Sequence, residues 1–235
     1  NEHRYDLTKT VMTHYTDYRI ALNGFAWNNG DPTADNSTIG DDHGNFPAWL
    51  HTAAVEITTA LPQGILPENV TQNEAKYQLL EALSAQEIRG QAHWTNWVVT
   101  ISSAGALGFL QTMPLNSERY NTHVDAEPII HVSCNLYAPD GNLSAGAQIL
   151  DGYLRDAFSG EWTMSGDSQG DLLAKVLAGY NGVGRNTLAG SPWATLFNTI
   201  FSDETRYHVF NIKQDLIAQG WALTIQDFER PPYNN

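Results

Sequence analysis

The chain has 235 residues, of which 42% are hydrophobic and 11% aromatic, and its formal net charge at pH 7 is −14. This length suits one domain with an embellishment, and the hydrophobic content is enough to bury a core. The negative charge argues against a nucleic-acid partner, because phosphate binding needs a basic surface. No apolar run approaches the roughly 18 residues of a membrane helix, so we expect no membrane span.

The first residue is Asn1, and neither a Met nor a charged and apolar leader precedes the folded sequence. We therefore expect a mature secreted protein or a piece trimmed to one, although a trimmed intracellular protein would look the same. The single cysteine, Cys134, excludes an intrachain disulfide framework. Its apolar neighbours favour a buried structural thiol over a nucleophile.

Apolar residues repeat at helical spacing near the N-terminus, which predicts an amphipathic helix over residues 6–23. A long loop rich in Asn, Asp and Gly follows over residues 27–45. Its carboxylates that could serve as oxygen ligands for Ca²⁺ are Asp31, Asp35, Asp41 and Asp42. Their spacing is not that of an EF-hand. We therefore expect a solvated acidic loop, with Ca²⁺ binding as the alternative, and no metal or other cofactor.

Residues 46–60 are predicted to be helical, with Asn45 as the cap and Leu50, Ala54 and Ile57 on one face. The next residues, 61–69, contain two prolines and a glycine and are predicted to be a connection. We accordingly divide the chain into an N-terminal helical extension, residues 1–70, and a larger helical domain, residues 71–235.

The segment Thr71–Glu74 has the pattern of a capping box and predicts the start of a helix. Along this helix Lys76, Leu80, Leu83 and Glu87 are spaced 4, 3 and 4 residues apart, so they share one face. A carboxylate beside two leucines loses some of its water, which raises its pKa. Glu87 is therefore a candidate general acid for chemistry near neutral pH.

An insert over residues 91–101 separates this helix from a turn of small residues. The turn, residues 102–108, reads Ser-Ser-Ala-Gly-Ala-Leu-Gly, a composition that lets the backbone approach a ligand closely. It continues as Phe-Leu-Gln-Thr-Met-Pro over residues 109–114. A short hairpin around residues 97–113 is the place where strands are predicted.

The next predicted helix has Asn142 as its cap. Its inward-facing residues are expected to be Ala145, Ile149, Tyr153 and Leu154. A polar turn over residues 158–170, which holds Trp162, is expected to follow it.

Three later helical patterns complete the chain. The first carries the apolar stripe Leu173, Val176, Leu177 and Tyr180 and is ended by glycines. The second begins at Ser191-Pro192, with Trp193, Phe197 and Phe201 on one face. The last begins at Asp203, with Val209, Ile212 and Leu216 facing inward and Gly220 at its end. The fold is therefore predicted to be mostly α.

Four stretches occur in an order that is typical of one family. They are Gln86-Glu87 with residues 102–114, Asn142–Leu150 (Asn-Leu-Ser-Ala-Gly-Ala-Gln-Ile-Leu), Leu177–Gly184 (Leu-Ala-Gly-Tyr-Asn-Gly-Val-Gly) and Asp203–Val209 (Asp-Glu-Thr-Arg-Tyr-His-Val). Over roughly residues 72–218 the chain resembles the soluble lytic transglycosylases, which are relatives of goose-type lysozyme. The resemblance is to enzymes of the glycoside hydrolase family 23 type. The resemblance implies a mostly α, lysozyme-like domain. Two features depart from the family pattern: Ile88 replaces the Ser expected after Glu87, and the insert is longer.

The resemblance also implies the chemistry, which is cleavage of β-1,4 glycosidic bonds in peptidoglycan by a single Glu. Glu87 would protonate the glycosidic oxygen, and the acetamido group of the substrate would supply the internal nucleophile. The same Glu would then activate the 6-hydroxyl, giving a 1,6-anhydro product as a lytic transglycosylase, or water, as a muramidase. By motif position, the residues expected to bind substrate or line its cleft are Ser102, Gln111, Met113, Tyr180, Asn181 and Glu204. Trp94 and Trp97 of the insert could stack on sugar rings. They could equally pack the insert against the core, and both roles can hold at once.

The expected partner is peptidoglycan or a related amino-sugar polysaccharide. We expect the protein to be a monomer and to be secreted or periplasmic. One alternative is a chitinase or chitosanase acting on a polymer of N-acetylglucosamine. Another is a sugar-binding module without turnover, which Ile88 and the insert motivate and the retained Glu87, Gln111 and Tyr180 oppose. Lyase and hydrolase stay open, because the difference depends on whether water or the 6-hydroxyl reaches the intermediate.

Overall fold

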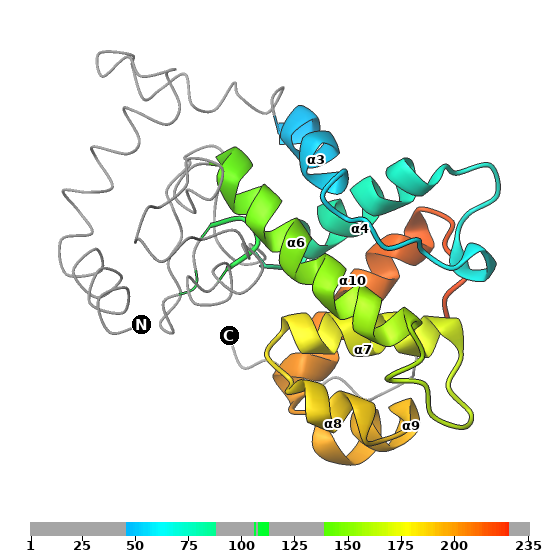
Figure 1. Cartoon of the computed structure of the whole chain (residues 1–235). Helices are drawn as coiled ribbons and strands as arrows, with labels where there is room; N and C mark the ends of the chain where they lie inside the picture. The colour runs from blue at the N-terminus through cyan, green and yellow to red at the C-terminus, as the bar shows by residue number, and fades with distance from the viewer. Residues whose placement is uncertain (1–45, 88–105, 107, 113–138, 226–235) are drawn as a thin grey trace, which may run out of the picture. The chain divides into compact units, whose positions relative to one another are not determined.

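The computed structural model describes residues 46–87, 106, 108–112 and 139–225 (Figure 1). Its elements are the helices α3 (Phe46–Ala54), α4 (Gln72–Glu87), α6 (Pro139–Phe158), α7 (Gln169–Tyr180), α8 (Arg185–Ala189), α9 (Trp193–Thr195) and α10 (Asp203–Ala218), the 3₁₀ turn η2 (Gln63–Ile65) and the π-helical turn η4 (Leu196–Ile200). Within these residues no strand occurs, so the prediction of a mostly α fold is confirmed. No helix in the described ranges is both long and apolar enough to cross a membrane.

The chain divides into two compact units. The first comprises residues 1–61 and 71–155, and its described part contains α3, α4, the turn at 108–112 and most of α6. The second comprises residues 62–70 and 156–235, and its described part contains η2 and the elements from α7 to α10.

Helix α4 organises the described part of the first unit. Its sequence is rich in Ala, Leu, Gln and Glu, which are strong helix formers, and it contains no β-branched residue. Thr71 Oγ accepts a hydrogen bond from the backbone N–H of Glu74 at 3.2 Å, which is the Thr half of the predicted capping box. The buried face of α4 includes Leu79, Leu80 and Leu83, and α3 packs against this helix.

Helix α3 ends at Ala54, so the prediction of a helix continuing to residue 60 is wrong. The residues that follow include the β-branched Val55 and Ile57, which lose side-chain freedom in a helix. Tertiary partners satisfy their backbone instead: the buried Lys76 ammonium donates to the carbonyl of Ile57 at 2.6 Å, and the N–H of Thr59 donates to Asp151 at 2.7 Å. The latter bond ties this segment to α6.

Helix α7 lies at the centre of the second unit. Ser168 and Asp171 form a capping box at its start, and every residue from Leu172 to Gly179 is buried. Helices α8, α9 and α10 and the turn η2 all contact it. Lys175, which is fully buried, donates to the carbonyl of Trp162 at 2.9 Å and lies 2.7 Å from a carboxylate oxygen of Asp167.

The short helix α9 begins one residue later than predicted, with Pro192 as the residue before it. Trp193 is buried, and its ring centroid lies 5.5 Å from that of Phe197 and 5.5 Å from that of Phe201. The three aromatic residues predicted to share a face therefore form one cluster. The last helix, α10, begins at Asp203 and is followed by Gly220 at φ 93°, as predicted.

Several predictions lie outside the described residues. These are the helix over residues 6–23, the acidic loop with its four aspartates, the cap Asn45, Cys134, the insert with Trp94 and Trp97, Ser102 and Met113, and most of the predicted hairpin. The division at residue 70 and the N-terminal helical extension stay predictions.

Candidate active site

Glu87 is the last described residue of α4 and is half-buried. Lys76, Leu80 and Leu83, which precede it on the same face, are buried. The predicted stripe of a carboxylate with two leucines is therefore confirmed. The helix presents Glu87 at the edge of an apolar core, where a carboxyl group has lost part of its contact with water.

The turn that follows the small residues is held in an uncommon backbone conformation. Gly108 has φ 72°, and Gln111 has φ 44°, a region that residues with a side chain seldom adopt. Two hydrogen bonds close the turn: the backbone N–H of Gln111 donates to the carbonyl of Gly108 at 3.1 Å, and the Gln111 side-chain amide donates to the same carbonyl at 2.7 Å. The half-buried Gln111 side chain is thus oriented by its own turn.

Asn142 holds this turn from α6. Its side chain is fully buried, and its Oδ1 accepts a hydrogen bond from the backbone N–H of Leu110 at 3.1 Å. A Cβ atom on Gly108 would lie 2.4 Å from Nδ2 and 2.5 Å from Cγ of Asn142, so only glycine fits there. The prediction of Asn142 as a helix cap is wrong, because α6 already begins at Pro139 and the Asn142 side chain binds a distant loop instead. Sequence reasoning missed this role, although the glycine of the turn was its one signal.

Tyr180 and Asn181 lie in the second unit, at the end of α7, and both are half-buried. Gly182 has φ 95°; its N–H donates to the carbonyl of Gly179 at 3.0 Å, and the N–H of Val183 donates to that of Ala178 at 3.1 Å. This pair of bonds is a Schellman motif. The Tyr-Asn-Gly pattern therefore ends the helix directly after Tyr180, which fixes the backbone that carries its ring.

Glu204 also lies in the second unit, in the first turn of α10, and is exposed. Its neighbours in the motif have structural partners. Ser202 Oγ accepts from the N–H of Thr205 at 3.2 Å, and the Arg206 guanidinium donates to the carbonyl of Asn198, in the turn η4, at 3.0 Å. The Thr of this motif thus takes part in the cap of α10, and the Arg joins α10 to the turn η4. A catalytic role for Glu204 stays a prediction.

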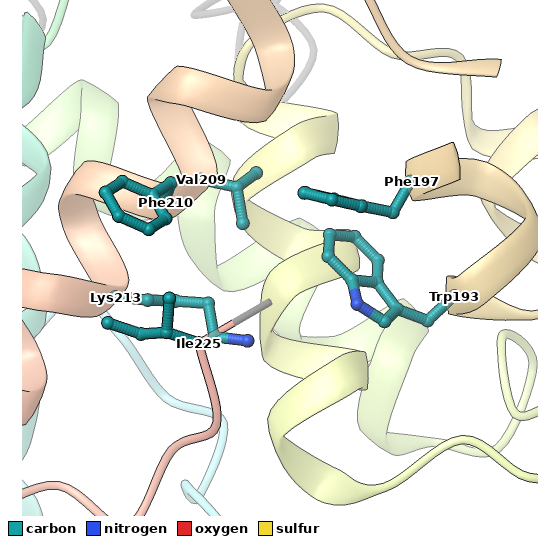
Figure 2. Close-up of a pocket in the computed structure, with 6 residues that line it drawn as sticks. All are labelled: Trp193, Phe197, Val209, Phe210, Lys213 and Ile225. Atoms are coloured by element: carbon teal, nitrogen blue, oxygen red, sulfur yellow. The ribbon is translucent and has the colours of Figure 1, made fainter. Parts of the chain in front are cut away.

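The second unit contains a small pocket that Figure 2 shows in close-up. It is lined by Trp193, Phe197, Val209, Phe210, Lys213 and Ile225. Its volume of about 10 Å³ holds roughly one water molecule and no sugar ring. The Lys213 ammonium is directed toward the indole of Trp193, 5.8 Å from the ring centroid. Burial lowers the pKa of Lys213, and the carboxylate of Asp171 opposes that shift. This pocket belongs to the packing of the unit.

Comparison with known families identifies the chain. The family model described as "Transglycosylase SLT domain" matches residues 66–189, which is more than half of the 235 residues. The chain belongs to the transglycosylase SLT domain family. The matched residues of this SLT domain include Glu87, Gln111, Asn142, Tyr180 and Asn181.

The match ends before α10, so Glu204 rests on the motif resemblance alone. Comparisons with curated proteins and with solved structures gave no match for this chain. The family match and the helical structure together confirm a mostly α fold of the SLT, lysozyme-like type. At family level, membership supports a transglycosylase that cleaves peptidoglycan.

Proposed function

We propose that this SLT domain cleaves the β-1,4 glycosidic bonds of peptidoglycan, with Glu87 as the single general acid and base. The observation that carries the proposal is the position of Glu87: it ends the buried stripe of α4 within the segment that the family model matches. Partial loss of water at this position favours the protonated carboxyl group, the form that a general acid needs. The expected rise in the pKa of Glu87 stays a prediction.

The reaction then needs no second carboxylate. Glu87 donates its proton to the glycosidic oxygen as the bond to the anomeric carbon breaks, and the acetamido oxygen of the same sugar attacks that carbon from the other face. The Glu87 carboxylate next removes a proton from the 6-hydroxyl, whose oxygen displaces the acetamido group and gives a 1,6-anhydro ring. If water takes the place of the 6-hydroxyl, the product is a reducing end, as from a muramidase.

The other motif residues have proposed roles around this step. Gln111 and Ser102 would hydrogen-bond the substrate or orient Glu87, Met113 would line the cleft, and Tyr180 would lie near the reacting sugar. The fixed amide of Gln111 supports its part in this proposal, since a hydrogen-bonding group that is already oriented binds without further loss of entropy. The cleavage of peptidoglycan would take place in the cell wall, and the protein would be secreted or periplasmic and act as a monomer.

The test is mass spectrometry of the products from purified peptidoglycan and from chitin oligomers. Wild type is compared with Glu87→Gln, which keeps the shape of the side chain and removes its acid. The matched control is Glu81→Gln, which makes the same change elsewhere on α4, where Glu81 accepts a hydrogen bond from Tyr77 at 3.3 Å. We expect anhydromuropeptides from wild type and Glu81→Gln, and a loss of at least about 100-fold in Glu87→Gln.

Other products would change the assignment in defined ways. Reducing-end muropeptides would keep Glu87 as the acid and make the enzyme a hydrolase. Chitooligomers without muropeptides would move the substrate to a polymer of N-acetylglucosamine. Equal activity in Glu87→Gln and wild type would exclude Glu87 as the acid, and binding without products from either polymer would indicate a sugar-binding module.

A further inference from the structure

Asn142 is a fully buried polar residue inside the first turn of α6, and its side chain serves a turn more than 30 positions earlier in the chain. Asn142 is the fourth residue of α6 and so lies past the cap position, and its Oδ1 accepts the N–H of Leu110. Leu110 is itself fully buried, so no water can replace that acceptor. This hydrogen bond joins the first turn of α6 to the turn at residues 108–112.

The turn depends on such an external partner because its own conformation is unfavourable. Gln111 adopts φ 44°, and such residues keep that backbone only where the surrounding structure holds it. The amide of Asn142 accepts the N–H of Leu110 and fills the space that a side chain on Gly108 would need. Gly108 in turn supplies the carbonyl that accepts the Gln111 side-chain amide.

We propose that Asn142 is a positioning residue, which sets the location of the Gln111 amide through the Gly108–Gln111 turn. The contacts run in an unbroken series: Asn142 to Leu110 and Gly108, and the Gly108 carbonyl to Gln111 Nε2 at 2.7 Å. Because a carbonyl only accepts, it also decides which end of the Gln111 amide faces the turn. This inference rests on the proposed function, in which Gln111 contacts the substrate or Glu87.

The test compares three substitutions in the full chain. Asn142→Leu keeps the approximate shape and removes the acceptor, and Asn142→Asp keeps an acceptor oxygen for Leu110. Thr58→Val is the matched control, because it removes a different hydrogen bond to α6, that of Thr58 Oγ with Asp151 at 2.8 Å. The readouts are kcat and KM for release of soluble muropeptides, and hydrogen exchange of the Leu110 amide by NMR.

We expect Asn142→Leu to lower kcat by about 10- to 100-fold while KM changes by less than about threefold. Asn142→Asp should recover kcat to within about threefold of wild type, and Thr58→Val should match wild type. Leu110 should exchange at least about tenfold faster in Asn142→Leu and at the normal rate in Thr58→Val.

Wild-type kcat in a folded Asn142→Leu protein would overturn the proposal, and so would an equal loss in Thr58→Val. If Asn142→Leu does not fold, the smaller Asn142→Ala, which also removes the acceptor, replaces it: a loss of kcat that Asn142→Asp recovers supports the proposal, and wild-type kcat in a folded Asn142→Ala protein overturns it. If wild type releases no products, the proposed function fails. The exchange rate of Leu110 then still tells whether Asn142 holds the turn.

Discussion

His208 lies on α10 with 3% of its surface exposed, and burial lowers its pKa from the ordinary 6.5 to about 4. Between these two pH values the unfolded chain binds a proton that the folded protein does not bind. The free energy of unfolding therefore falls as the pH is lowered through this window. Above about pH 6.5 the ring is neutral in both states, and its burial carries no such loss. Acidification should destabilise the protein through this one buried ring.

The size of the effect follows from the difference between the two pKa values. Each unit corresponds to about 1.4 kcal/mol, so the full loss is about 3 kcal/mol, of which about 2 kcal/mol is reached by pH 5. In a chain of 235 residues, a loss of 2 kcal/mol lowers the melting temperature by roughly 4–8 °C.

The assay is urea unfolding followed by circular dichroism at pH 7, 6 and 5. Wild type is compared with His208→Gln and His208→Leu, which do not titrate. Carboxylates elsewhere titrate in all three proteins, so the difference in unfolding free energy between wild type and each variant isolates the ring. Between pH 7 and pH 5 we expect the unfolding free energy of wild type to fall by about 2 kcal/mol more than that of either variant. A difference that stays constant over this range would refute the reasoning.

Two further predictions concern buried lysines of the second unit. Lys175→Met should lower the unfolding free energy by about 3–5 kcal/mol, because it leaves the carboxylate of Asp167 buried without its cation. Adding Asp167→Asn should recover part of that loss in the same urea assay. Equal stability of Lys175→Met and wild type would contradict this prediction. Lys213→Met should instead raise the unfolding free energy at pH 7 by about 1–3 kcal/mol, since burial disfavours the charged form of Lys213 despite the opposing carboxylate of Asp171. The gain should shrink as the pH rises through the lowered pKa of Lys213, and a loss of stability at pH 7 would show that the ammonium is well solvated or paired.

Local sequence patterns were sufficient for much of the helical structure. The apolar spacing of α4 placed Glu87 on the same face as Leu80 and Leu83, and the structure confirms that face. The start of α10 at Asp203 and the glycine after it were predicted in the same way, because caps and terminators act within a few residues of the helix that they end.

Partners distant in sequence explain where those predictions were wrong. Helix α3 stops at Ala54, where Lys76 and Asp151 supply hydrogen bonds to the residues that follow. The start of α7 is different, because the capping box of Ser168 and Asp171 is a local feature within the segment predicted to be a polar turn. A local pattern states which backbone groups need a partner, and long-range contacts decide which partner each group finds.

The candidate site shows the same division. The residue order of four motifs, read from the sequence alone, determined the family and the proposed acid, Glu87, because chemistry restricts which side chains can serve at those positions. The small residues of the turn 102–108 also predicted a close approach of the backbone to a ligand. Only the tertiary structure decided that Asn142 fills the space beside Gly108 and binds Leu110. The reason is physical: an asparagine side chain can cap its own helix or satisfy a buried N–H elsewhere, and the choice depends on which group the folded chain removes from water.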